Sequence, residues 1–298
     1  MDKMFWQSII DNEYAIPPEA SVAALTPELL SYLGSVDPEL REETTYAILD
    51  AWIHRGYYSH AELWKIATRL LHHLTIGLGE QQSDTIFWRS FSLLILTEII
   101  YHDLTHPTLS EIEVRLVLEQ ALAYFEDEQD LRGYDIEKGW MHAIAHAADL
   151  LWVLAQHRDI ATSDLSRIMD ALAEKITAPV AHVYLYGEEE RLVRTVMGVL
   201  QRDLLTLPSL ATWLELLTHP RGRIAWSESF EGGKMMDVVR SEAETCARHN
   251  TKYFLCSLYF QLRSPGFAHL TFVEQRPAVA DALLPLIENA LSQIRAWC

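Results

Sequence analysis

Residues 139–152 read GWMHAIAHAADLLW, and their polar and apolar residues separate with the period of an α-helix. A helix turns by about 100° per residue, so with His142 at zero, His146 lies at about 40° and Asp149 at about −20°. The opposite side, at about 120–200°, is apolar. It holds Trp140, Ile144, Ala147, Leu151 and Leu154. The segment therefore predicts a helix with a core-facing side and a polar stripe opposite it.

Helical periodicity extends through nearly the whole chain, and strand-like alternation is scarce. The amphipathic stretches are 38–55, 59–77, 84–104, 109–128, 135–157, 163–178, 188–206, 208–219, 240–263 and 273–297, with weaker ones at 3–11 and 26–34. Several follow a residue typical of a helix start, such as Ser59, Asp84, Ser110 or Asp135. The best strand candidate, 181–186, is interpreted as a connection. The sequence predicts an all-α protein.

The helix starts at 59, 110 and 163 are spaced by about fifty residues, with a second helix inside each interval. This spacing predicts stacked antiparallel helix pairs, as in a HEAT- or armadillo-like superhelix, with an α/α toroid as the alternative. We expect one continuous domain over residues 1–298, with a possible flap or seam at 220–237. In such stacks the second helices commonly line a concave face, which would place His142, His146 and Asp149 in a groove.

The chain is acidic, with a net charge of −18. Most of the acidic excess lies in residues 1–150, and it would repel phosphate backbones and anionic lipids, so nucleic acid and membranes are not expected partners. No apolar run is long enough for a membrane span, and the acidic N-terminus does not resemble a secretory signal. The three cysteines show no CxxC spacing. These features favour a cytoplasmic protein; the oligomeric state stays open.

His142 and His146 are four residues apart, a spacing that can direct two imidazoles to one divalent metal ion, with Asp149 as a third ligand or as an orienting partner. Ala143 stands where a HExxH metalloprotease has its glutamate, so that class is excluded. Three interpretations stay open: a hydrogen-bonded polar face or ligand site without metal, a metal site, and acid–base catalysis without metal.

Charged and aromatic residues precede this segment and are candidate ligand-binding residues together with it. They are Arg132, Tyr134, Glu137, Lys138 and Trp140. Gly139 is a poor helix former, which suggests that another group approaches the backbone closely. Arg89 and Glu98 interrupt a helix that is otherwise apolar on all sides. Arg89 is also a candidate site residue, although a buried salt bridge is the favoured explanation for such charges. His72 and His73 are interpreted as packing residues.

Several motifs together resemble a bacterial family known only as a domain of unknown function. They are FSLLIL at 91–96, RGY at 132–134, the EKGWxHx3Hx2DLL element at 137–151, EERL at 189–192 and FLxSLYFQLR at 254–263. The resemblance implies an all-helical bacterial protein and supports a shared site at the His–His–Asp element, but it implies no activity.

The leading functional hypothesis is a helical-repeat protein that binds a small ligand or a peptide in a concave groove centred on His142, His146 and Asp149. The first alternative is a metal-dependent, hydrolase-type enzyme at the same place, with a metal-bound water and Asp149 or Glu137 as the base. The second alternative is a protein-interaction scaffold that uses the acidic surface.

Overall fold

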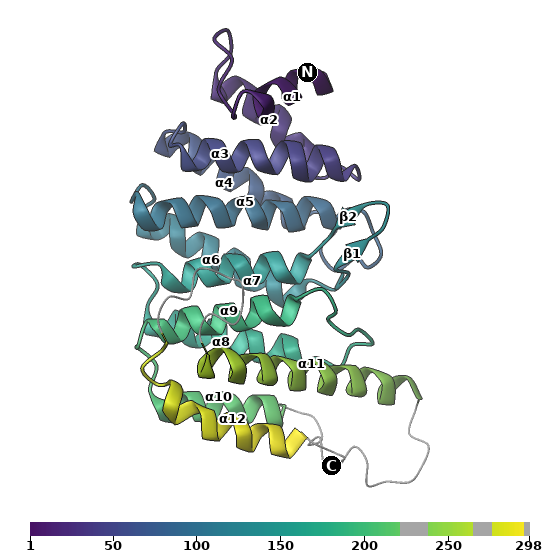
Figure 1. Cartoon of the computed structure of the whole chain (residues 1–298), viewed down its shortest axis with the longest axis vertical. Coiled ribbons are helices and arrows are strands. Elements are labelled where there is room, and N and C mark those ends of the chain that lie inside the picture. Colours follow the sequence, from purple (N-terminus) through teal and green to yellow (C-terminus); the bar gives the residue numbers. More distant parts are fainter. Residues whose placement is uncertain (221–237, 265–275, 295–298) are drawn as a thin grey trace. The chain divides into compact units, whose positions relative to one another are not determined.

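The computed structural model describes residues 1–220, 238–264 and 276–294, and it is built almost entirely of α-helices (Figure 1). The predicted all-α class is confirmed. The chain divides into two compact units, unit 1 (Met1–Asp159) and unit 2 (Ile160–Cys298). The expectation of a single continuous domain stays a prediction. Within the described ranges, no helix is both long and apolar enough to cross a membrane.

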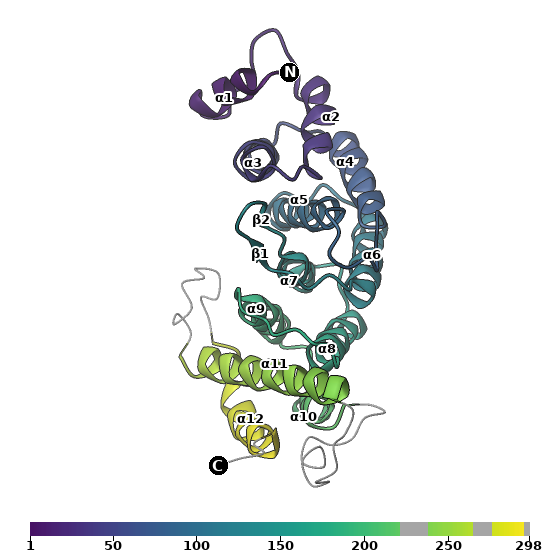
Figure 2. The same cartoon turned by 90° about the vertical axis from the view of Figure 1, so that its right-hand side faces the viewer.

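Unit 1 contains seven α-helices, one π-helix and a short hairpin within residues 1–159, all of which are described. They are α1 (Lys3–Asp11), α2 (Val22–Tyr32), the π-helix η1 (Glu39–Tyr46), α3 (Ala47–His54), α4 (His60–His73), α5 (Ile86–Thr105), α6 (Glu111–Asp127), β1 (Tyr134–Asp135), β2 (Gly139–Trp140) and α7 (Ala143–Gln156). Helices α3, α5 and α7 lie side by side in one layer, and α2, α4 and α6 form the second (Figure 2). The central helix α5 packs on α3, α4 and α7.

Helices α4 and α6 begin where the sequence predicts, and the reason is local. The Ser59 hydroxyl accepts from the Glu62 backbone N–H while the Glu62 carboxylate accepts from the Ser59 N–H, and Ser110 and Glu113 repeat this arrangement. Such capping boxes satisfy N–H groups that have no partner in the first helical turn. They fix the start of two successive helix pairs.

The helix predicted for 135–157 is partly wrong, because α7 begins only at Ala143. Residues 134–140 form the hairpin instead, with Tyr134 opposite Trp140 and Asp135 opposite Gly139. The Asp135 carboxylate closes its turn by accepting from the backbone N–H groups of Glu137 and Lys138. Gly139 has a φ of +75°, in the left-handed region that favours glycine. This turn chemistry overrides the helical periodicity.

The described part of unit 2 contains five helices, which are α8 (Thr162–Thr177), α9 (Glu188–Gln201), α10 (Leu207–Thr218), α11 (Val238–Arg263) and α12 (Ala280–Ile294). Helix α11 contacts α8, α9 and α12, and its Phe254 is buried with its ring edge toward Trp213 of α10. Residues 181–186 contain no strand, as expected. The predicted flap at 220–237 lies outside the described residues apart from Pro220.

Candidate functional site

Between its two ends, the buried helix α5 reaches the surface along a narrow stripe. Between residues 89 and 103 only Leu94, Glu98 and Tyr101 are partly exposed. Their spacing of four and three residues places them on one side of the helix. Ser90 and Phe91 of α5 contact His146 of α7, while Glu98 contacts His54 of α3. The exposed stripe therefore runs between α3 and α7.

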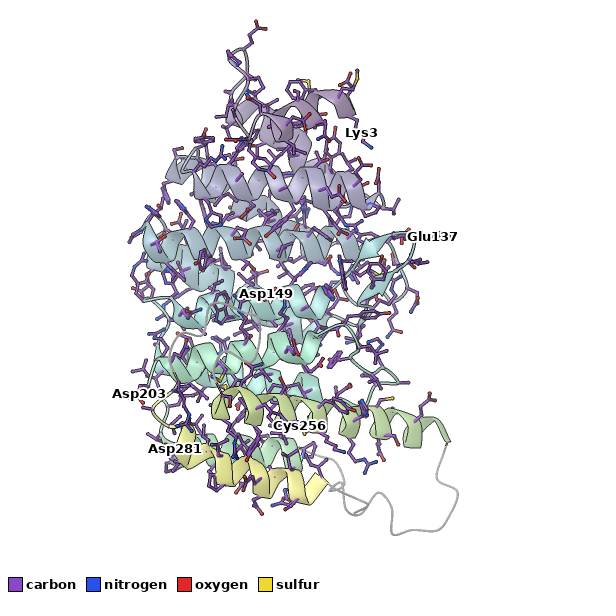
Figure 3. The ribbon with its side chains drawn as sticks, in the orientation of Figure 1. Lys3, Glu137, Asp149, Asp203, Cys256 and Asp281 are labelled. Carbon is purple, nitrogen blue, oxygen red and sulfur yellow. The ribbon has the colours of Figure 1, made fainter. Side chains whose placement is uncertain are left out.

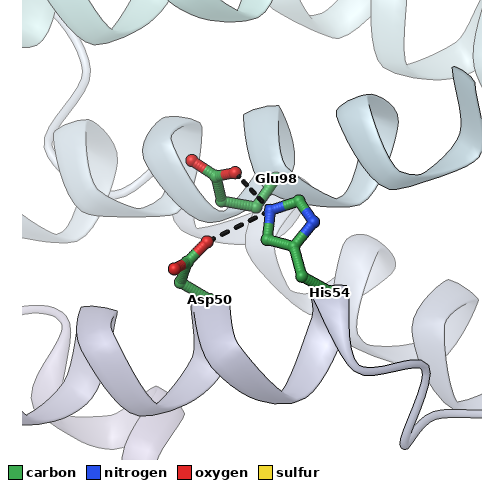
Figure 4. Close-up of side chains that lie close together, drawn as sticks. All are labelled: Asp50, His54 and Glu98. Atoms are coloured by element: carbon green, nitrogen blue, oxygen red, sulfur yellow. Dashed lines mark hydrogen bonds and ion pairs between the residues drawn. The ribbon is translucent and has the colours of Figure 1, made fainter. Parts of the chain in front are cut away.

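Asp50, His54 and Glu98 form a polar cluster across α3 and α5 (Figure 4). Asp50 and His54 are one turn apart on α3, and both they and Glu98 direct side chains to the same point. The Nε2 atom of His54 lies 3.1 Å from Oδ1 of Asp50 and 2.9 Å from Oε2 of Glu98. The side chains are 36%, 34% and 16% exposed for Asp50, His54 and Glu98, respectively. The cluster is thus open to solvent on one side.

The two carboxylates control the protonation of His54. Hydrogen bonds to Asp50 and to Glu98 raise the pKa of His54 to about 9. A nearby negative charge favours the charged form of an imidazole. At neutral pH and without a metal ion, His54 is therefore an imidazolium that bridges two carboxylates.

Tyr46, the last residue of η1, orients the carboxylate of Glu98. Its hydroxyl donates a hydrogen bond of 3.1 Å to Oε1 of Glu98. Burial raises the pKa of Tyr46 far above its usual value, and the charges of Glu98, Asp50 and Asp149 raise it further. The phenol therefore stays protonated and remains a donor.

Aromatic side chains continue the cluster toward α7. The Tyr101 ring lies edge-on to the His54 ring, with centroids 5.7 Å apart, and Trp152 of α7 stacks on Tyr101 at 6.4 Å. Asp149 lies along α7 between His146 and Trp152, near the middle of that helix (Figure 3). We define the α3–α5–α7 face as the cluster residues with Tyr46, the partly exposed residues of α5 and the α7 residue Asp149. It comprises Tyr46, Asp50, His54, Leu94, Glu98, Tyr101 and Asp149.

His142, His146 and Asp149 do not share one helical stripe as predicted, because His142 precedes α7. It has a left-handed backbone, with a φ of 45°. The structure nevertheless brings the rings of His142 and His146 together, with centroids 5.7 Å apart. His146 is buried, and its Nδ1 lies 3.0 Å from the carbonyl oxygen of Ser90, so this nitrogen carries the proton. A metal ion at these three residues stays a prediction.

The aromatic residues of the hairpin form a row with the two histidines. Tyr134 packs edge-on against Trp140 at 4.8 Å, and Trp140 stacks on His142 at 4.3 Å. Beyond His142 the row continues through His146 to Phe91, which lies 5.4 Å from His146. It thus extends from the partly exposed hairpin to the buried surface of α5.

The predicted cationic residues of the hairpin have structural partners. The Arg132 guanidinium binds both carboxylate oxygens of Asp130 and donates to the Ser83 carbonyl, and Lys138 pairs with Asp84 at 2.6 Å. Glu137 is exposed at the turn (Figure 3). These contacts attach the hairpin to the segment before α5.

Arg89 forms the buried salt bridge that the sequence favours. Its guanidinium donates to both Glu128 carboxylate oxygens, at 2.6 and 3.0 Å, and also to the carbonyls of Ile76 and Gly77. Both side chains of the pair are fully buried. Arg89 therefore holds α5, the α4–α5 connection and the end of α6 together. His73 is buried against Trp88, which agrees with its interpretation as a packing residue.

Sequence reasoning did not identify Asp50, His54 or Tyr46 as candidates. The signal for Asp50 and His54 was a four-residue spacing like that of His142 and His146. Glu98 did stand out in the sequence, as a charge within an apolar helix. What joins these residues is the packing of α3 on α5, which the local sequence does not encode.

The fold and site define an all-α protein whose helical layer carries an open histidine–carboxylate cluster. The family model described as "Protein of unknown function (DUF2785)" matches residues 74–260, more than half of the chain. The chain belongs to this family, which confirms the resemblance to a family of unknown function. The matched range includes Glu98, His142, His146 and Asp149 but begins after Asp50 and His54. No curated protein and no solved structure matches the chain.

Proposed function

We propose that this protein is a HEAT-like helical-repeat protein that binds a small ligand or a short peptide on the α3–α5–α7 face. The observation that carries the proposal is that a buried helical layer exposes polar and aromatic side chains from neighbouring helices at one place. The repeated helix pairs α4–α5 and α6–α7, both with a capping box on the first helix, support the repeat architecture.

The chemistry of the face suits a polar ligand with a small apolar or aromatic part. His54 offers a donor, while Asp50 and Glu98 offer acceptors. Leu94 and Tyr101 are partly exposed beside them. Binding sites combine apolar walls with a few fixed polar groups, because the polar groups set the orientation of the ligand. Hydrogen bonding by Tyr46 and the packing of α5 reduce the cost of ordering these groups.

This proposal moves the centre of the site away from the position expected from the sequence. Asp149 is retained at the α7 edge of the face, whereas His142 and Trp140 lie at the N-terminal end of α7 and on the hairpin. We also infer a cytoplasmic location, which the free thiols of Cys246 and Cys256 support.

A thermal-shift screen of polar metabolites and short peptides against the full chain tests the proposal. For each compound that raises the melting temperature, we expect Tyr101→Ala and Glu98→Gln to remove the shift. Glu111→Gln is the matched control, because it removes an exposed carboxylate from α6, away from the face. If a compound raised the melting temperature of both face variants by as much as that of the original protein, the binding site would lie elsewhere and the proposal would be overturned.

The metal-dependent enzyme is the second candidate, and the approach of the His142 and His146 rings favours it. In this alternative the two imidazoles hold a metal ion, with Asp149 or the exposed Glu137 as base. The test is elemental analysis of protein purified without a chelator or a nickel column, repeated on His142→Ala. A bound metal that is absent from His142→Ala supports this candidate, and an equal metal content in both proteins rejects it.

A further inference from the structure

We propose that Asp50, His54 and Glu98 form an open binding site for one divalent metal ion of the zinc class. This site differs from the His142–His146–Asp149 set, and it goes beyond the proposed binding of a small ligand or peptide. Among the described residues, it is the group of histidine, cysteine and acidic side chains whose possible ligand atoms all lie within 4.8 Å of one another.

The present distances are close to those that a zinc ion requires. Zn²⁺ binds imidazole nitrogen and carboxylate oxygen at about 2.0–2.2 Å, so ligand atoms in a tetrahedral site lie about 3.3–3.5 Å apart. The Nε2 atom of His54 is 3.1 Å from Asp50 and 2.9 Å from Glu98. A metal ion would replace the proton on Nε2 of His54, and each of these two histidine–carboxylate distances would then lengthen by only a few tenths of an ångström.

The helical frame holds the three side chains in position. Asp50 and His54 come from successive turns of α3, whose intervening Trp52 and Ile53 are buried. Glu98 comes from α5, which packs directly on α3. Metal-ligating carboxylates usually accept a second hydrogen bond that fixes their orientation. The Tyr46 hydroxyl provides this bond to the other oxygen of Glu98.

The donor set indicates the class of metal. One imidazole and two carboxylates suit Zn²⁺, which accepts both nitrogen and oxygen ligands. Mn²⁺ binds similar sites more weakly, and Mg²⁺ and Ca²⁺ prefer sites made entirely of oxygen. Three protein ligands that are partly exposed leave at least one coordination position for water or a ligand group. The site therefore resembles open zinc sites rather than closed structural ones.

Isothermal titration of the chelator-treated full chain with ZnCl₂, MnCl₂ and MgCl₂ tests the site. We expect one Zn²⁺ ion to bind per chain, Mn²⁺ to bind more weakly, and Mg²⁺ to show no measurable binding. His54→Ala and Asp50→Asn should each weaken Zn²⁺ binding by about 100-fold or more. Circular dichroism verifies that both variants are folded. If one substitution perturbs helix α3, the other variant still tests the site.

His60→Ala is the matched control, because His60 also faces a carboxylate, Glu113, at 3.1 Å, but only a two-residue pair forms there. It should leave the affinity unchanged. Visible absorption of the Co²⁺ complex should show a four- or five-coordinate ion that is lost in His54→Ala. No Zn²⁺ binding, or binding that survives both His54→Ala and Asp50→Asn, would overturn the proposal. If Zn²⁺ binding were lost in His142→Ala alone, the metal would be assigned to the His142–His146–Asp149 set.

Discussion

Gly139 combines a left-handed backbone with close packing against η1. A Cβ atom at this position would lie 2.7 Å from the Glu42 carboxylate and 2.9 Å from the Pro38 side chain. Residues of η1 also anchor the hairpin, because Arg41 donates to the Lys138 carbonyl at 2.6 Å and the Glu42 carboxylate accepts from the Trp140 N–H. Gly139 therefore decides whether β2 can approach η1.

We expect Gly139→Ala to destabilise the protein by about 2–3 kcal/mol, since it adds a steric clash to the cost of a positive φ. Gly56→Ala is the matched control, because Gly56 also has a positive φ but no neighbouring atom within 4 Å of the added Cβ. It should cost only about 1 kcal/mol. Urea denaturation measures the free energy of unfolding of both variants. Equal losses of stability would show that the contact of Gly139 with η1 does not contribute.

His73 makes stability depend on pH. Burial, followed by the charges of Arg69 and His72, lowers the pKa of His73 to about 4. Its Nδ1 lies 3.1 Å from the Ser92 hydroxyl. The unfolded chain binds a proton near the ordinary histidine value, whereas the folded protein does so only near pH 4. The stability that a neutral His73 contributes is therefore present above about pH 6.5 and is lost as the pH falls toward 4.

The comparison with His73→Gln isolates this effect. Between about pH 7 and pH 4.5, the free energy of unfolding of the original protein should fall by about 2–3 kcal/mol more than that of the variant. Denaturant titrations of both proteins at several pH values provide the measurement. A difference in stability that stays constant with pH would mean that His73 protonates equally well in the folded state.

At the scale of elements, the Arg89–Glu128 pair connects α5 to the end of α6. The Glu128 carboxylate also accepts from the Tyr124 hydroxyl at 2.6 Å and from the backbone N–H groups of Gln129 and Asp130. Removing Arg89 would leave a buried carboxylate without its counter-charge, and breaking a buried pair in this way typically costs about 3–5 kcal/mol.

We therefore expect Arg89→Met to destabilise the protein by about 3–5 kcal/mol, and Arg89→Met with Glu128→Leu to cost less than the sum of the two single changes. Arg115→Met is the control, because Arg115 forms an exposed pair with Glu111 on α6. Arg115→Met should change the free energy of unfolding by no more than about 1 kcal/mol. Chemical denaturation measures the four variants, and additive single and double changes would argue against a coupled buried pair.

The elements that the sequence predicts well are those with local signals. Ser59 with Glu62 and Ser110 with Glu113 mark helix starts through contacts three residues apart. The break before Ala143 combines the local turn at Asp135 with contacts from Arg41 and Glu42, which are nearly one hundred residues away. The partner of Arg89 and the neighbours of Glu98 also come from other helices. The charges in α5 could therefore be recognised as unusual, but their partners could not be named.

At the scale of the molecule, unit 1 contains its own core and its own polar anchors. Its last residues are tied to α5: the Asp103 carboxylate accepts from Nε2 of His157 at 2.9 Å and pairs with Arg158, also at 2.9 Å. It also accepts from the backbone N–H groups of Thr108 and Leu109. Both the Arg89–Glu128 pair and the Asp50–His54–Glu98 cluster lie within residues 1–159. The family match at residues 74–260 extends across the boundary between the units.

We expect residues 1–159, expressed alone, to fold and to melt cooperatively, because a unit of this size buries roughly 70% of the surface of its unfolded chain. The control is a shorter fragment that ends at His142, which keeps the hairpin but lacks α7. Without α7, the apolar surface of α5 that it covers would face water, and we expect no cooperative melting. Circular dichroism and thermal melting distinguish the outcomes. An unfolded 1–159 fragment would show that the two units form one cooperative domain, as the sequence predicts.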